Sequence, residues 1–229
     1  MKLGIVLPSY WYSDERKRLA KAAFHSLSQT EELYGHETRI LILIKGQVHD
    51  YANLIVPSIT RKFGVILKTD EGLTGTEQTL AFGTQYMIDN FGCDYVMWMG
   101  DDALFHPLWL WKLEGLIKRH PDAKSWSVYR SAYEWIHRTL DEVGEDVLVR
   151  SICGHGMTFT AQEWKEWGVD WKGVSTDPNA HTLDLTHFDQ RRGERWVTKK
   201  SYVQHTGKIG VHCDENTPEF ARDFQLVGE

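Results

Sequence analysis

Hydrophobic residues follow two different spacings along the first half of the chain. Short, nearly continuous apolar runs predict buried strands, and longer stretches with apolar residues three and four positions apart predict helices. The predicted strands are Leu3–Leu7, Arg39–Ile44, Val65–Leu67 and Tyr95–Met99. The predicted helices follow Ser13, cover Tyr51–Lys62 and Thr76–Phe91, and begin again at Pro107. This alternation is typical of parallel strands joined by crossover helices.

The pattern changes after about residue 120, where clean strands become fewer and Trp, Gly and His more frequent. Strands are predicted at Ser125–Tyr129, Cys153–Thr160 and Trp196–Gln204, and helices at Ala161–Trp167 and Leu183–Arg192. No stretch rich in Pro, Gly or Ser separates the halves. We therefore expect one α/β domain over residues 1–229, with a Rossmann-like, mainly parallel half (1–120) and a mixed half (121–229).

Composition and charge exclude several classes of protein. The chain is 41% hydrophobic and 25% charged, which is an ordinary balance for a globular domain. Its net charge is −6 and it has no basic block, which argues against non-specific binding to nucleic acid. The three cysteines are far apart and form no Cys-x-x-Cys motif, so neither a disulfide framework nor a thiolate zinc site is expected. No apolar run is long enough for a membrane span or a signal peptide, so we expect a cytoplasmic protein without integral membrane contact.

Two adjacent carboxylates, Asp101 and Asp102, directly follow the predicted strand Tyr95–Met99 and its Gly100. Ligands of open α/β sheets bind at the carboxyl ends of the strands. The pair could instead cap the next helix, but Pro107 lies five residues past Asp102, whereas a cap directly precedes its helix. Hard carboxylate oxygens suit Mg²⁺ or Mn²⁺, which keep open positions for a diphosphate. Metal binding is therefore the preferred interpretation.

Two motifs in the first half resemble those of the family 2 glycosyltransferases of GT-A fold. The run Leu3-Gly-Ile-Val-Leu-Pro-Ser-Tyr10 is similar to that family's strand ending in Pro-Thr-Tyr-Asn. The run from Cys93 to Pro107 is similar to the strand ending in Asp-x-Asp with a Pro five residues further on. Asp102 stands at the second Asp, Gly100 replaces the first, and Asp101 is a candidate substitute.

The resemblance continues in order through the second half. Residues 153–160 and 164–170 resemble the acceptor-side strand and helix of the family. Asp184-Leu185, with Gly193 further on, fits the end of the Glu-Asp-x-Asp-Leu segment, although His181 and Thr182 stand at its leading Glu-Asp. Ser201-Tyr-Val-Gln-His-Thr-Gly207 resembles the Val-x-His-x-Gly after the last core strand.

The resemblance implies a single GT-A-like domain in which residues 1–120 bind a nucleotide sugar and residues 121–229 bind the acceptor and carry catalysis. It implies metal-dependent, inverting transfer of the sugar from a UDP-linked donor to a hydroxyl-bearing acceptor. That acceptor would be a glycan, a protein, a small molecule or a modified DNA base.

The same resemblance implies roles for individual residues. Mn²⁺ or Mg²⁺ would be held by Asp102, Asp101 and His205 and would take up charge from the departing diphosphate. Asp184 would be the general base, with Asp189 and Asp177 as alternatives. Contacts to the nucleotide are expected from Pro8, Ser9, Tyr10, Gly72, Thr76, Gln78 and Asp101.

Two other functions stay open. A nucleotidyltransferase of similar architecture would need a Gly-rich turn with Arg and Lys after the first strand, where Tyr10-Trp11-Tyr12 stands. A non-catalytic module that binds a nucleotide sugar or glycan would tolerate Gly100 and Thr182 at positions where the family carries carboxylates.

Overall fold

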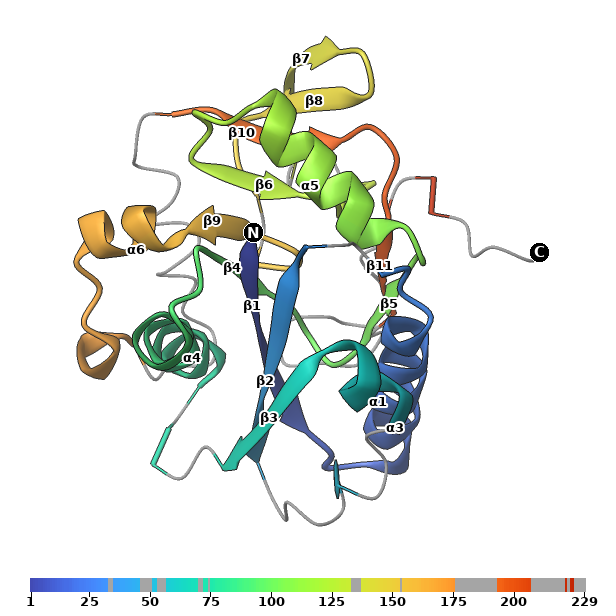
Figure 1. Cartoon of the computed structure of the whole chain (residues 1–229), viewed down its shortest axis with the longest axis vertical. Helices are drawn as coiled ribbons and strands as arrows, with labels where there is room; N and C mark the ends of the chain where they lie inside the picture. Colours follow the sequence, from blue (N-terminus) through green and yellow to red (C-terminus); the bar gives the residue numbers. More distant parts are fainter. Residues whose placement is uncertain are drawn as a thin grey trace.

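The computed structural model describes residues 1–32, 35–45, 51–52, 57–69, 72–73, 75–132, 137–152, 154–175, 193–206, 221 and 223–224. Within them, a large mixed sheet is covered by helices on both faces (Figure 1). Its strand order is β3-β2-β1-β4-β9-β6-β10-β8-β7, and a separate two-stranded sheet pairs β11 with β5. None of the helices among these residues combines the length and apolar character that crossing a membrane requires.

The first half of the sheet is parallel, as the sequence predicts. Its strands are β1 (Lys2–Tyr10), β2 (Glu37–Lys45), β3 (Gly64–Thr69) and β4 (Tyr95–Trp98). The side chains of 40–44 in β2 are all buried, on both faces of the strand. A strand reads as a continuous apolar run when helices cover both of its faces, which explains why these strands were predictable.

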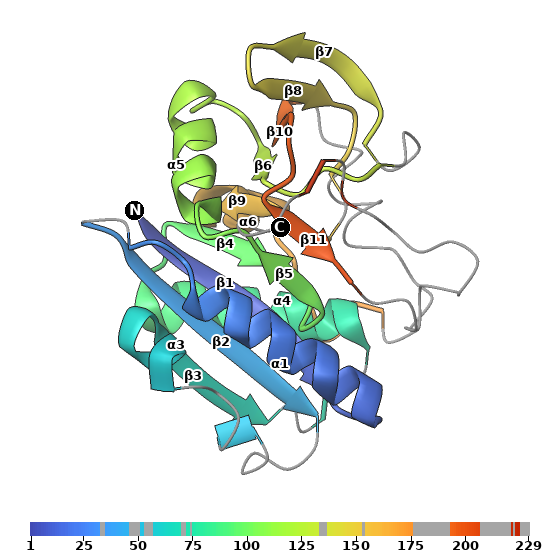
Figure 2. The same ribbon diagram turned by 90° about the vertical axis from the view of Figure 1, so that its right-hand side faces the viewer.

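Helices α1 (Asp14–Ser28) and α3 (Pro57–Lys62) cover one face of the parallel strands, and α4 (Thr76–Phe91) covers the other (Figures 1 and 2). Ser13 caps α1 as predicted, because its hydroxyl accepts a hydrogen bond from the Arg16 N–H at 3.2 Å. Of the helix predicted over Tyr51–Lys62, the described part comprises Tyr51, Ala52 and α3.

The second half is mixed, which confirms the predicted fold class. It contains β6 (Ser125–Ser127), β7 (Thr139–Val143), β8 (Asp146–Val149), β9 (Thr158–Thr160) and β10 (Arg195–Thr198), with α5 (Trp109–Arg119), α6 (Ala161–Trp167) and a short 3₁₀ turn (Trp171–Gly173). Strand β9 runs antiparallel to β4, β10 runs parallel to β6, and β7 and β8 form a hairpin. The small sheet pairs β5 (Ala103–Phe105) antiparallel to β11 (Val203–His205).

The single strand predicted over Trp196–Gln204 is wrong: β10 and β11 are separate strands in different sheets. The chain changes sheet at Ser201, whose buried hydroxyl donates to the Arg130 carbonyl at 2.9 Å and accepts from the Arg130 N–H at 2.6 Å. These two hydrogen bonds hold the chain between β10 and β11, where it turns toward β5.

Other boundaries also differ from the prediction. Among the described residues of the predicted 153–160 strand, only Thr158–Thr160 form a strand, because a turn at Gly156, with φ at +74°, precedes it. Helix α5 begins at Trp109 rather than Pro107, since the Trp109 N–H donates to the His106 carbonyl at 3.0 Å in the turn before it. The strand predicted over Ser125–Tyr129 ends at Ser127. Strands β5, β7 and β8 were not predicted, and the predicted helix over 183–192 lies outside the described residues.

Gly83 lets α4 lie directly against the parallel strands. A Cβ atom at this position would stand 2.3 Å from Val6 Cγ1 and 3.0 Å from Leu43 Cδ1. By contrast, a Cβ on Gly115 in α5 would meet only the movable guanidinium of Arg119, at 3.0 Å. The two helical glycines therefore differ in packing and not in secondary structure.

We predict that Gly83→Ala lowers the free energy of unfolding by about 1–2 kcal/mol, because overpacking outweighs the gain in helix propensity. Gly115→Ala, as the matched control, should leave it unchanged or raise it by up to about 1 kcal/mol. Urea denaturation of the two variants and the wild type measures both values. Equal effects of the two substitutions would contradict the packing assigned to Gly83.

Candidate active site

The carboxyl ends of β1 and β4 lie next to each other and bring two predicted site residues together. The Met99 N–H donates to the Val6 carbonyl at 3.1 Å, which continues the β1–β4 pairing just before the Asp pair. Ser9, near the end of β1, donates from its hydroxyl to Asp101 Oδ2 at 2.5 Å. Asp101 has no exposed surface, so the Ser9 hydroxyl supplies a hydrogen bond that water cannot give to this buried carboxylate.

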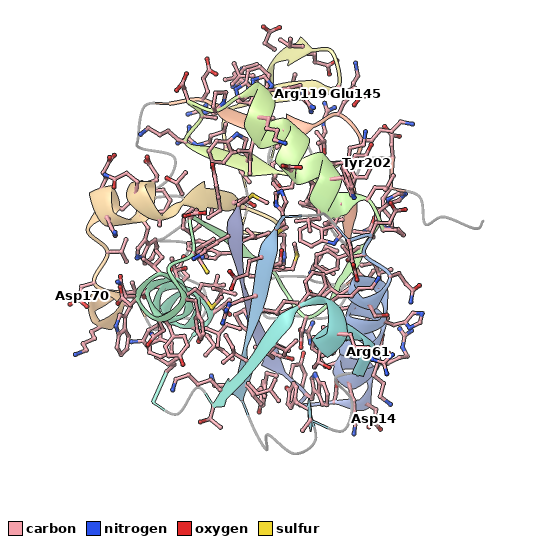
Figure 3. The ribbon with its side chains drawn as sticks, in the orientation of Figure 1. Asp14, Arg61, Arg119, Glu145, Asp170 and Tyr202 are labelled. Atoms are coloured by element: carbon pink, nitrogen blue, oxygen red, sulfur yellow. The ribbon has the colours of Figure 1, made fainter. Side chains whose placement is uncertain are left out.

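Arg16 of α1 lies between the two carboxylates. Its Nη1 is 2.5 Å from Asp102 Oδ2, and its Nη2 pairs with Asp101 Oδ1. Figure 3 shows Asp14, the first residue of α1, at the edge where β1 and β2 end. The Ser13 cap starts the helix at this edge and so places Arg16 in the first turn, beside the end of β4.

The sequence interpretation missed Arg16, although one signal for it exists. The first turn of a helix carries partial positive charge and favours Asp and Glu, as found here at Asp14 and Glu15. An arginine in the same turn is unfavourable unless an acidic partner offsets it. Arg16 therefore stood out in the sequence as a basic residue in a first turn, although this pattern does not identify its partner.

His205 reaches Asp102 through the small second sheet. In the β5–β11 pair His205 stands opposite Ala103, and its Nε2 lies 3.2 Å from Asp102 Oδ2. The backbone N–H and the hydroxyl of Thr206 both donate to the Asp102 carbonyl, at 2.8 and 2.7 Å. The structure thus brings Asp101, Asp102 and His205 together, as the sequence predicts.

The two carboxylates have opposite pKa shifts. Burial raises the pKa of Asp101 to about 6, although the charge of Arg16 opposes the rise. Burial acts in the same direction on Asp102, but the hydrogen bond and charge of His205, together with Arg16, outweigh it and hold the pKa of Asp102 below its usual range. Asp102 is therefore the ionised member of the pair across a wide pH range.

Gly100 stands at the position of the first Asp in the family that the motifs resemble, and it lies against Asp102. A Cβ atom on Gly100 would lie 2.6 Å from Asp102 Oδ1. With a side chain at this position, the Asp102 carboxylate would have to shift.

The carboxylates have the chemistry to bind Mn²⁺ or Mg²⁺, but their arrangement does not present a ligand set. Both oxygens of Asp101 accept hydrogen bonds, and Asp102 Oδ2 is shared by Arg16 and His205. Across the described part of the chain, no three His, Cys, Asp or Glu side chains are grouped to hold a metal ion. In this arrangement the Arg16 guanidinium lies between the two carboxylates.

The remaining predicted residues are distributed along the same edge or are not described. Tyr10 is half exposed at the end of β1, where its ring centroid lies 5.3 Å from that of Tyr12. Pro8 is partly buried, Gly72 and Thr76 are exposed, and Gln78 is buried in the first turn of α4. The candidate bases Asp177, Asp184 and Asp189 lie outside the described residues.

A row of aromatic rings leads from His205 into the second half. The His205 and His155 ring centroids are 4.2 Å apart, His155 and Tyr129 are 6.3 Å apart, and Tyr129 and His137 are 5.8 Å apart. His137 is buried and its Nδ1 accepts the Ser131 N–H at 3.0 Å. Burial, reinforced by the charge of Arg130, lowers the pKa of His137 to about 3.

A pocket of about 190 Å³ lies elsewhere, at the opposite edge of the sheet. Its lining includes Thr30 after the end of α1, Thr38 near the start of β2, and Lys62 at the end of α3. Since β1 and β2 begin at this edge, the pocket is remote from Asp102 and does not belong to the candidate site.

Comparison with known proteins identifies the class of fold. The sequence matches no protein-family model and no curated protein. The structure is similar to S. aureus TarS 1–349, with a TM-score of 0.64 at 13% identity over 89% of this chain and 60% of that one. The complex of TarS 1–349 with UDP-GlcNAc gives 0.65 at 11% identity, over 92% and 60%. A UDP-glucose pyrophosphorylase complexed with UDP-glucose gives 0.54 at 10% identity, over 88% and 91%.

At these identities the similarity is one of fold, and the present chain spans about 60% of the TarS 1–349 chains it matches. The predicted GT-A-like α/β fold is confirmed.

We predict that His137 lowers the stability of the folded protein as pH falls below about 6.5, because the unfolded chain then protonates this histidine while the buried imidazole stays neutral. This histidine should contribute up to about 1.4 kcal/mol per pH unit. The raised pKa of Asp101 acts in the opposite direction, but it does so in the wild type and in the variant alike. Urea denaturation at pH 7 and pH 5 should therefore show a more favourable change in stability on acidification for His137→Gln than for the wild type. His25→Gln, at an exposed histidine, is the matched control. An equal change in stability between pH 7 and pH 5 in both variants would refute the role of His137.

Proposed function

We propose that the protein transfers a sugar from a UDP-linked nucleotide sugar to an acceptor hydroxyl, with inversion at the anomeric carbon. The observation that supports this most directly is the group of Asp101, Asp102 and His205 at the carboxyl edge of a GT-A-like sheet. Ligands of open α/β sheets bind at this edge. We assign donor binding to residues 1–120, and acceptor binding and catalysis to residues 121–229.

The preference for a uridine nucleotide has two supports. TarS 1–349 has been crystallised with UDP-GlcNAc and with UDP, and the pyrophosphorylase with UDP-glucose, so proteins of this fold bind such nucleotides. In the present chain Tyr10 is half exposed at the end of β1. An exposed aromatic ring offers a planar apolar face to a base.

The chemistry requires two things of the chain. The departing diphosphate gains negative charge, so the site has to supply positive charge nearby. The acceptor hydroxyl has to lose its proton, and a carboxylate within hydrogen-bond reach raises the rate by about 10²–10⁴-fold. Asp184 remains the proposed base, with Asp189 and Asp177 as alternatives. One base opposite the leaving group gives a single in-line displacement, and hence inversion.

Mn²⁺ or Mg²⁺ enters this proposal as a competitor of Arg16. The Asp102 oxygen that a cation would use already accepts from Nη1 of Arg16. An ion held by Asp102 would offset the negative charge that the departing diphosphate gains.

A second candidate function is nucleotidyl transfer, as in a pyrophosphorylase. The similarity to the UDP-glucose pyrophosphorylase favours it, since this chain covers 91% of that one. Against it, residues 10–12 are aromatic, and Arg16, the next basic residue, is paired with the two Asp side chains. A triphosphate would need such a basic group unpaired.

We predict that UDP raises the melting temperature of the protein, whereas ADP and GDP do not. At a UDP concentration 100-fold above Kd, binding adds about 2.7 kcal/mol of stability, which corresponds to a rise of roughly 5–10 °C for a domain of this size. Differential scanning fluorimetry with each nucleotide, with and without Mn²⁺, measures the shift. A protein stabilised equally by all three nucleotides, or by none, would contradict a uridine-specific donor site.

A turnover assay distinguishes a glycosyltransferase from a non-catalytic module and from a nucleotidyltransferase. Water can replace the acceptor hydroxyl in this assay. We predict slow hydrolysis of a UDP-sugar to UDP and free sugar, lowered at least about 100-fold by Asp102→Asn. Asp122→Asn changes an exposed aspartate in the same way and should have no effect. Binding without hydrolysis would indicate a non-catalytic module, and UTP formation from UDP-glucose and pyrophosphate would indicate a nucleotidyltransferase.

A further inference from the structure

Arg16 occupies the place between two carboxylates where a cation would sit. Its two terminal nitrogens bind one carboxylate each, Nη1 to Asp102 and Nη2 to Asp101. Only 14% of the Arg16 side chain is exposed, and the Asp101 side chain is fully buried. The guanidinium thus closes this side of the pair to other ligands.

Electrostatics explains why a cation must lie between Asp101 and Asp102. Two adjacent buried carboxylates repel each other and are costly to ionise unless positive charge lies beside them. Arg16 supplies one unit of that charge, and its planar fork matches two separate acceptors. A divalent ion held by both carboxylates needs an oxygen of each, and both oxygens of Asp101 and Oδ2 of Asp102 already accept hydrogen bonds, so the ion and Arg16 compete for them.

The contacts of Arg16 also indicate how it would leave. Its Nε is buried and has no hydrogen-bond partner among the described residues. The guanidinium is therefore held through its two terminal nitrogens. When an ion takes over the carboxylate oxygens, Arg16 loses these partners, and the partly exposed side chain can be hydrated.

We propose that Arg16 is the resident counter-cation of the Asp101–Asp102 pair, and that Mn²⁺ or Mg²⁺ reaches Asp102 only by displacing it. This concerns the same site as the proposed function but rests on the Arg16–Asp contacts alone. Arg16 is a positioning residue in the ion-free state, since it fixes the orientation of Asp102. Arg16 and the metal ion therefore compete for the carboxylates of Asp101 and Asp102.

Titration with Mn²⁺ tests the competition directly, because the electron paramagnetic resonance signal of free Mn²⁺ disappears on binding. We expect Arg16→Gln to bind Mn²⁺ at least tenfold more tightly than the wild type. Arg18→Gln is the matched control: Arg18 lies on the same helix, is 68% exposed at its side chain and pairs with Glu15. It should bind Mn²⁺ as the wild type does.

Two further variants locate the ion and guard against misfolding. Adding Asp102→Asn to Arg16→Gln should abolish the gain in affinity. If Arg16→Gln does not fold, Arg16→Lys tests the proposal instead. Lysine keeps the positive charge but has no planar guanidinium to bridge two carboxylates. We expect Arg16→Lys to bind Mn²⁺ at least threefold more tightly than the wild type. Far-ultraviolet circular dichroism establishes which variants are folded.

The proposal is overturned if the folded Arg16 variant binds Mn²⁺ no more tightly than the wild type. It is also overturned if the gain persists when Asp102 is replaced. Because no nucleotide is present in these titrations, they are independent of the UDP melting experiment. A protein that shows the Mn²⁺ competition but ignores UDP would refute the proposed function and leave the role of Arg16 standing.

Discussion

The repulsion between two carboxylates buried side by side at the end of β4 is the constraint on which the site depends. Burial makes ionised Asp101 and Asp102 unfavourable, and Arg16 and His205 offset that cost from two other elements. Helix α1 and strand β11 must therefore both dock on the edge of the sheet before the pair is stable. Electrostatics at this point joins the parallel half of the fold to the mixed half.

The sequence predicts the parallel half well because burial on both faces leaves a strong local signal. Strands β1, β2 and β4 are nearly continuous apolar runs, and the Ser13 cap marks the start of α1. The mixed half is harder, since β5, β9 and β11 have three residues each and depend on long-range pairing. No local pattern indicates that Ser201 exchanges hydrogen bonds with Arg130 and that the single strand predicted there is divided between two sheets.

The candidate site also contains residues that the sequence predicts and a residue that only the fold brings to the site. Asp101, Asp102 and His205 carry motif signals, and the structure brings them together. Arg16 lies 86 residues from Asp102 in the chain and belongs to no motif, so only the fold reveals the contact. Gly100, which departs from the family motif, lies against this carboxylate, so a side chain at this position would require Asp102 to shift.

The small β5–β11 sheet makes the position of an imidazole depend on strand register. His205 faces Asp102 because it pairs opposite Ala103, and the next residue fastens itself to the Asp102 carbonyl. In a strand, successive side chains point to opposite sides, so a slip of one residue would turn His205 away and bring Gln204 or Thr206 to the acid. The register of three residue pairs therefore decides whether an imidazole lies beside Asp102.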